Sequence, residues 1–231
     1  MNKIFNIFML LMIVTLYNGC MYEFDWGPLY EETKTLEELV AEYGEDKAFT
    51  HNHYFPQAND NIVACINKNM DREYIDASID AIAIWNEIDG IQIDYELSTK
   101  CQEQVDILSF SIYTGDEEVT YCESLNDEPD NGYGDEKMAC NIYFFKDDTG
   151  EIGFSFIKYN LANMDKLPYN EKLTIAVHEL GHTFGLVDFK DKELRKYTVM
   201  FHAHSGRIQN GELTEFDLYN INWMYNNRVS K

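Results

Sequence analysis

Two histidines, His178 and His182, stand one helical turn apart in a segment whose apolar residues recur at spacings of three and four. This periodicity predicts a helix with one buried face, and Pro168 and Asn170 provide a stop and an N-cap at its start. Residues four apart lie on the same face of a helix, so both imidazoles can reach a single metal ion. The apolar stripe consists of Leu173, Ala176, Val177, Leu180 and Phe184.

Three further residues extend this pair of histidines into a candidate metal site. Glu179 lies beside His178, where its carboxylate can act on a metal-bound water instead of binding the metal. Gly185 can end the helix in a left-handed conformation, so that the chain turns back and Asp188 faces the metal. We therefore expect His178, His182 and Asp188 to be ligands and Glu179 to be a general base. The alternative is a pair of ordinary helix histidines with satisfied hydrogen bonds.

The extended motif resembles that of the metzincin zinc peptidases, His-Glu-x-x-His-x-x-Gly-x-x-His or Asp followed by a methionine-containing turn. In this chain Met200 closes the run Tyr197-Thr198-Val199-Met200, twelve residues after Asp188. Most of the family has His as the third ligand, and Asp188 is shared with a minority similar to the small bacterial snapalysins. The resemblance implies one catalytic Zn²⁺, with Met200 as the apolar floor of its site.

Other residues compete with Asp188 for the third ligand position. His202 and His204 follow Met200 closely in the sequence. Glu215 as a ligand would move the chain to the thermolysin-like class, in which Gly185 and the methionine turn would have no purpose. An Asp ligand lowers the charge of the site by one relative to a neutral His, which makes the metal a weaker Lewis acid.

The expected function is that of a zinc-dependent endopeptidase with a protein or peptide substrate. Zinc held by three protein ligands keeps a fourth position for water and lowers the pKa of that water from about 15.7 toward about 7. Glu179 would accept the water's proton during attack on the peptide carbonyl and later pass it to the leaving amine. The alternative is a zinc-containing cell-surface binding or adhesion protein with little or no turnover.

The first twenty residues predict a signal peptide and therefore export. Lys3 precedes an apolar run from Ile4 to Leu16, and Asn18-Gly19-Cys20 supplies a small residue before a cysteine. The run is shorter than the roughly 20 residues that a membrane-spanning helix needs. Lipid attachment to Cys20 would make a bacterial lipoprotein held at the cell surface or outer membrane, and plain secretion is the alternative.

The remaining cysteines agree with an oxidising compartment. Four remain once Cys20 is set aside, an even number suited to two disulfides with three open pairings. Proximity in the sequence favours Cys65 with Cys101 and Cys122 with Cys140. The formal net charge of −23 argues against a nucleic-acid partner, since binding to phosphates needs clustered Lys and Arg. We expect a monomer whose only membrane contact is the lipid anchor.

The order of predicted elements suits an α/β fold. Residues 21–60 read as a linker or short pro-segment with one helix from Thr35 to Gly44, and residues 61–228 as the catalytic domain. By resemblance, this domain has a twisted mixed sheet with one antiparallel edge strand at residues 141–145, a zinc-binding helix, a methionine turn and a C-terminal helix. The predicted elements are strands at 61–66, 91–95, 107–113, 141–145 and 152–157, and helices at 71–88 and from Thr214 to Tyr225.

The segment from Gly115 to Glu136 is rich in acidic residues around Gly132 and Gly134. Oxygen ligands and glycine turns are what Ca²⁺ needs, but the spacing does not fit an EF-hand loop. The alternatives are therefore a calcium site of another kind and a solvated acidic loop closed by Cys122 and Cys140.

Overall fold

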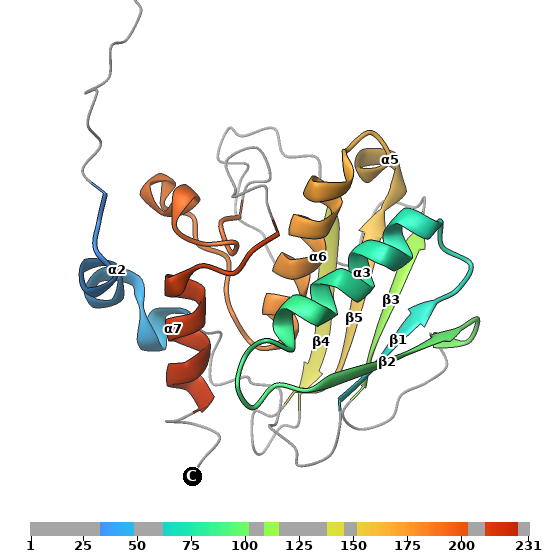
Figure 1. The fold of residues 1–231 in the computed structure, drawn as a ribbon, viewed down its shortest axis with the longest axis horizontal. Helices are drawn as coiled ribbons and strands as arrows, with labels where there is room; N and C mark the ends of the chain where they lie inside the picture. The colour runs from blue at the N-terminus through green and yellow to red at the C-terminus, as the bar shows by residue number, and fades with distance from the viewer. Residues whose placement is uncertain are drawn as a thin grey trace, which may run out of the picture. The chain divides into compact units, whose positions relative to one another are not determined.

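The computed structural model describes residues 33–48, 62–101, 109–115, 138–145, 152–202 and 211–225, and from Thr35 onward the chain forms one compact unit (Figure 1). The predicted signal peptide with Cys20 and the acidic residues 116–136 lie outside the described residues. Among the helices of the described ranges, none is long and apolar enough to cross a membrane.

A five-stranded mixed sheet forms the centre of this unit, in the order β2-β1-β3-β5-β4. Neighbouring strands are parallel except β4 and β5, which are antiparallel, and β4 lies at one edge. The predicted α/β class and the predicted antiparallel edge strand are both confirmed. The strands are β1 (Ile62–Asn67), β2 (Ile93–Ser98), β3 (Ser109–Gly115), β4 (Ala139–Phe145) and β5 (Ile152–Asn160).

Two long helices, α3 (Arg72–Trp85) and α6 (Tyr169–Thr183), lie side by side over one face of the sheet (Figure 1). The indole Nε1 of Trp85 donates a hydrogen bond to the Val177 carbonyl oxygen at 3.1 Å, and its ring stacks on Phe184 with 4.8 Å between centroids. Helix α3 therefore holds the segment of α6 that carries the two histidines. A short helix, α5 (Leu161–Met164), follows β5.

The helices differ from the predicted ones at their ends. The helix expected over residues 71–88 stops at Trp85, because the amide of Asn86 turns to bond both backbone groups of Ile93 at 2.9 and 2.7 Å. Helix α6 begins at Tyr169 with Pro168 as its N-cap, and not with Asn170. Proline fits the start of a helix because its fixed φ suits the first turn and its missing N–H would have no partner there.

The N-terminal part of the unit contains α2 (Leu36–Tyr43) and a 3₁₀ helix, η1 (Glu45–Ala48), and both pack against the C-terminal helix α7 (Glu215–Met224). Helix α2 begins with the predicted cap at Thr35 and ends before Gly44. The backbone N–H of Glu45 donates to Oδ1 of Asn220 at 3.0 Å, and Leu39 and Ala48 are buried. We predicted a linker or pro-segment at residues 21–60, but the part of it from Thr35 onward belongs to the compact unit.

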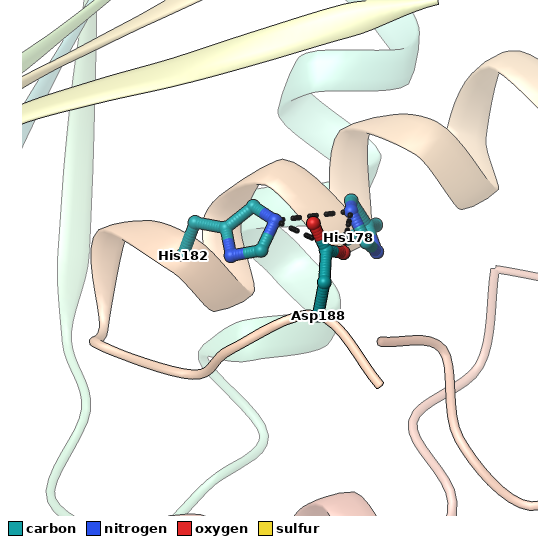
Figure 2. A group of neighbouring side chains, drawn as sticks. All are labelled: His178, His182 and Asp188. Atoms are coloured by element: carbon teal, nitrogen blue, oxygen red, sulfur yellow. Dashed lines mark hydrogen bonds and ion pairs between the residues drawn. The ribbon is translucent and has the colours of Figure 1, made fainter. Parts of the chain in front are cut away.

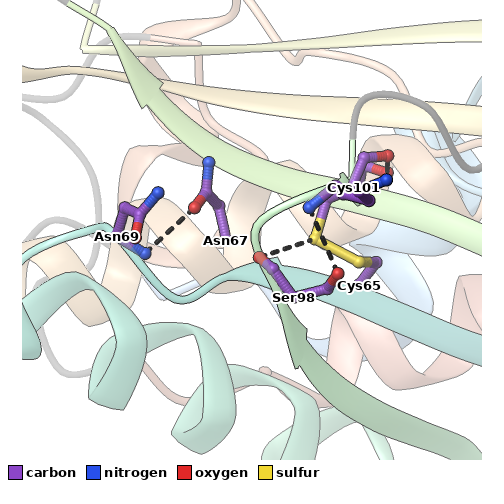
Figure 3. The surroundings of a disulfide bond; sticks show 7 residues. Cys65, Asn67, Asn69, Ser98 and Cys101 are labelled. Carbon is purple, nitrogen blue, oxygen red and sulfur yellow. Dashed lines mark hydrogen bonds between the residues drawn. A yellow bond between two sulfur atoms is a disulfide. The ribbon is translucent and has the colours of Figure 1, made fainter.

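A disulfide joins Cys65 on β1 to Cys101 just beyond β2 (Figure 3), which confirms the predicted pairing. The carbonyl oxygen of Cys101 accepts a hydrogen bond from the hydroxyl of Ser111 on β3 at 2.6 Å. Cys140 is also disulfide-bonded. Its predicted partner, Cys122, lies outside the described residues.

Candidate metal centre

The side chains of His178, His182 and Asp188 meet at the C-terminal half of α6, as Figure 2 shows. The two Nε2 atoms of the histidines lie 3.1 Å apart. Oδ1 of Asp188 is 3.3 Å from Nε2 of His178 and 3.5 Å from Nε2 of His182. A search of the described residues for three His, Cys, Asp or Glu side chains that could hold one metal ion finds this group, whose ligand atoms all lie within 4.8 Å of one another.

These three distances suit a tetrahedral metal site. With metal–ligand bonds of about 2.0–2.1 Å, a tetrahedral ion holds its ligand atoms about 3.3 Å apart. The observed separations of 3.1, 3.3 and 3.5 Å bracket that value. Three protein donors leave one of the four positions for another molecule, which is typical of catalytic and not of structural zinc sites.

Hydrogen bonds on the far side of each imidazole fix its orientation and its tautomer. Nδ1 of His178 lies 2.9 Å from the Val199 carbonyl oxygen, and Nδ1 of His182 lies 2.8 Å from the Leu186 carbonyl oxygen. A carbonyl oxygen only accepts hydrogen bonds, so each Nδ1 carries a proton and donates. In the neutral rings both Nε2 lone pairs then point at each other and at a carboxylate oxygen. Such a group needs a cation at its centre, and backbone partners of this kind are typical of metal-binding histidines.

The charges within the cluster shift the pKa values of its residues. Burial by itself lowers the pKa of His182, but the charge of Asp188 and its hydrogen bond outweigh burial and raise this pKa to about 9. Burial raises the pKa of Asp188, whereas the charge of His182 and the hydrogen bonds from both imidazoles hold it well below its usual range. The site therefore already stabilises a positive charge among its three donors.

Exposure increases from one side of the cluster to the other. The side chain of His178 is 5% exposed, that of His182 is 18% exposed and that of Asp188 is 37% exposed. The ligand group is thus accessible from the side of Asp188, while α6 and the residues around Val199 close it on the side of His178.

The end of α6 explains how Asp188 reaches the histidines. Gly185 has a φ of +93°, which confirms the predicted left-handed turn. Its N–H bonds the His182 carbonyl oxygen at 2.9 Å, and the N–H of Leu186 bonds the Gly181 carbonyl oxygen at 3.0 Å. This pair of bonds is the Schellman motif, which reverses the chain at a helix C-terminus. The same turn places the Leu186 carbonyl oxygen against Nδ1 of His182.

Backbone hydrogen bonds hold Asp188 from both sides. The N–H of Val187 donates to the Ala48 carbonyl oxygen at 3.1 Å, so η1 contacts the residue before the ligand. The N–H of Phe189 donates to the Met200 carbonyl oxygen at 2.9 Å, so the methionine turn contacts the residue after it. The position of Asp188 therefore depends on segments distant in sequence.

Met200 lies fully buried against α6, beside Gly181. A Cβ atom on Gly181 would lie 2.3 Å from Sδ of Met200, closer than any van der Waals contact allows. The glycine between the two histidines is thus required by Met200, whose side chain packs against the helix at this position.

Asp217 on α7 is a residue of this region that the sequence pattern did not single out. Its buried carboxylate accepts hydrogen bonds from the hydroxyl of Thr198 and from the N–H of Val199 at 3.0 Å. The carbonyl oxygen of Val199 is the partner of His178, so Asp217 acts on a ligand through one residue. Burial raises the pKa of this carboxyl even though its hydrogen bonds lower it. The capping box of Thr214 and Asp217 is the sequence signal that points to this residue.

Glu179 is buried on α6, and its negative charge raises the pKa of His182. Of the competing ligands that the structure describes, His202 and Glu215, neither is brought to the cluster. His202 packs against Phe201 and is not part of the group, Glu215 is exposed at the start of α7, and His204 lies outside the described residues.

Comparison with known proteins does not place this chain in a family: neither a scan against protein-family models nor a search of the curated proteins finds a match.

Proposed function

We propose that this protein is a zinc-dependent endopeptidase. The observation that carries the proposal is the cluster of His178, His182 and Asp188, whose three donors have tetrahedral spacing and an accessible side, with Glu179 on the same helix. A structural zinc site would have four protein donors, often cysteines. Two imidazoles and one carboxylate form a known catalytic donor set for zinc.

In the proposed hydrolysis of a peptide bond, different residues of the chain have different roles. Zinc in this site would supply Lewis acidity, which polarises the scissile carbonyl group and acidifies water. Glu179 accepts the proton of the attacking water at its carboxylate and returns it to the leaving amine nitrogen. The carbonyl oxygens of Val199 and Leu186 keep both imidazoles in the tautomer that presents Nε2 to the metal.

The edge strand supports a peptide as the substrate. Among the strands that the structure describes, β4 pairs with β5 alone and is the last strand of the sheet. An extended peptide can add to such an edge through backbone hydrogen bonds. The metzincin peptidases, which the motif resembles, bind their substrates in this way, and we extend that mode to this chain.

We also propose that the protein acts outside the cytoplasm, as a lipoprotein anchored through Cys20 or as a secreted enzyme. The disulfide between Cys65 and Cys101 supports an oxidising compartment, because cytosolic thiols are kept reduced. The substrate is then an extracellular or cell-surface protein or peptide.

Two substitutions test the proposed roles together. Glu179→Gln should keep zinc binding within a few-fold of wild type and lower peptide cleavage by at least about 10³-fold, since the proton acceptor is lost. Asp188→Ala should instead lower zinc affinity by about 10- to 100-fold or more. Zinc binding is measured by calorimetry and cleavage with a mixed peptide library, before and after chelator treatment. Glu171→Gln, on the same helix but away from the cluster, is the control and should behave as wild type.

Zinc-loaded wild-type protein that cleaves no member of the library would refute the enzymatic proposal. Full turnover in Glu179→Gln would refute the role of this carboxylate. Unchanged zinc affinity in Asp188→Ala would refute the third ligand.

A further inference from the structure

A small polar cluster lies between α6 and the sheet, behind Glu179. We call it the Asn141 cluster, and it consists of Asn141 on β4, Ser155 on β5 and Thr183 on α6. The side-chain amide of Asn141 donates to the Glu179 carbonyl oxygen at 2.7 Å and to Oγ1 of Thr183 at 2.6 Å. Its Oδ1 accepts from the hydroxyl of Ser155 at 2.7 Å.

Polar side chains are unusual at a buried face between a helix and a sheet. Ser155 and Thr183 are fully buried, and Asn141 is half-buried. An apolar set of the same shape would pack there without the cost of desolvating an amide and two hydroxyls. The cluster is well satisfied, because Asn141 uses both amide protons and its oxygen. A buried polar network whose hydrogen bonds are all satisfied holds the helix and the strands that it joins in one relative position, because any other position would break those bonds.

The elements joined are the two that peptide cleavage must hold in register. Asn141 belongs to β4, the edge strand of the described sheet, and an extended peptide would pair along the side of β4 that faces away from β5. Its amide bonds the backbone carbonyl of Glu179, the residue that carries the proposed general base. Rotation or sliding of α6 would break this bond and the one to Thr183, so the cluster fixes the base relative to the strand.

We propose that Asn141 is a positioning residue, which sets the carboxylate of Glu179 relative to a peptide backbone bound at β4. This inference rests on the proposed peptidase function. It requires that loss of the amide shifts α6, and with it the base, relative to β4, while the three metal donors keep their positions relative to one another. The side chain of Asn141 makes no hydrogen bond to any of these donors.

The test compares substitutions at the cluster with a matched substitution elsewhere. Asn141→Ala removes the amide, and Thr183→Val removes one of its acceptors at nearly constant shape, whereas Thr183→Ser retains the hydroxyl. Asn86→Ala is the control, because the Asn86 amide also makes two bonds to backbone groups, at 2.9 and 2.7 Å, but joins α3 to β2. Thermal unfolding of each variant reports its loss of stability.

Four quantities are then measured: kcat and KM of the zinc-loaded protein for a peptide substrate, its affinity for a short peptide hydroxamate, and zinc affinity. A hydroxamate chelates the metal and passes its proton to a neighbouring carboxylate, so its affinity reports the position of Glu179 without turnover. We expect Asn141→Ala to lower kcat by about 10- to 100-fold, since displacement of about 1 Å has effects of that size. KM and zinc affinity should stay within about threefold of wild type.

Hydroxamate affinity should fall in Asn141→Ala and Thr183→Val but persist in Thr183→Ser and Asn86→Ala. The proposal is overturned if Asn141→Ala loses no more kcat than Asn86→Ala at equal stability, or if zinc affinity falls as much as kcat. If zinc-loaded wild-type protein cleaves no peptide, the proposed function fails, and hydroxamate affinity alone decides the inference. Equal hydroxamate affinity in Asn141→Ala and Asn86→Ala would then refute it.

Discussion

Gly181 occupies the interior of α6, where alanine would ordinarily stabilise the helix by about 0.8–1 kcal/mol. A Cβ atom at this position would lie 2.3 Å from Sδ and 3.0 Å from Cε of Met200. Met200 is fully buried, so its side chain cannot move into solvent to relieve the overlap. Overpacking of a core costs about 1–3 kcal/mol. Gly181→Ala should therefore lower the free energy of unfolding by about 0–2 kcal/mol, the overpacking cost less the gain in helix propensity.

A double-mutant cycle separates these two opposing effects. Met200→Val removes Sδ and Cε, the two atoms that the new Cβ would overlap, while it leaves a smaller apolar side chain in the core. In that background Gly181→Ala should stabilise the protein by about 0.8–1 kcal/mol, because only the propensity term remains. The coupling free energy between the two sites should then equal the overpacking cost, about 1–3 kcal/mol.

Denaturant unfolding of the four proteins, in the presence of a chelator, measures this coupling. The chelator matters because a bound metal stabilises the native state and would mask differences in packing. Additivity of the two substitutions within about 0.5 kcal/mol would refute the argument that Met200 dictates glycine at this position. Destabilisation by Gly181→Ala of equal size in both backgrounds would show that the helix itself rejects the alanine.

Other expectations concern the surroundings of the site and the core. Asp217→Ala leaves the buried N–H of Val199 without its acceptor, so we expect a loss of about 2–4 kcal/mol in unfolding free energy, measured with denaturant, together with weaker zinc binding. Stability unaffected by this change would contradict the role given to Asp217. Burial raises the pKa values of Tyr159 and Tyr225 well above 10, so the folded state holds these protons more tightly than the unfolded state. Unfolding free energy should therefore fall above about pH 10, by roughly 1.4 kcal/mol per pH unit for each tyrosine. Constant stability from pH 10 to 11.5 would argue against their burial.

Much of the fold follows from signals that are local in the sequence. The cap at Thr35, the turn at Gly185 and the start of α7 each depend on residues within one helical turn, and the structure has them where they were expected. The same holds for the convergence of His178 and His182, since i and i+4 share a helix face in any surrounding. All five predicted strands are present, but β2 begins two residues later than predicted, at Ile93. Its start depends on the amide of Asn86, a contact that no periodicity of β2 reveals.

The sequence by itself therefore determined the elements and the candidate ligand set, because hydrogen bonding within a helix and its ends acts over a few residues. Only the tertiary structure decided what surrounds the ligands. The bonds between Ala48 and Val187, between Asp217 and Val199 and between Asn141 and Glu179 join residues that are 139, 18 and 38 positions apart in the sequence. Which groups meet in these bonds depends on how whole helices and strands pack against one another. A single backbone or polar group leaves no periodic pattern in the sequence from which such a contact could be predicted.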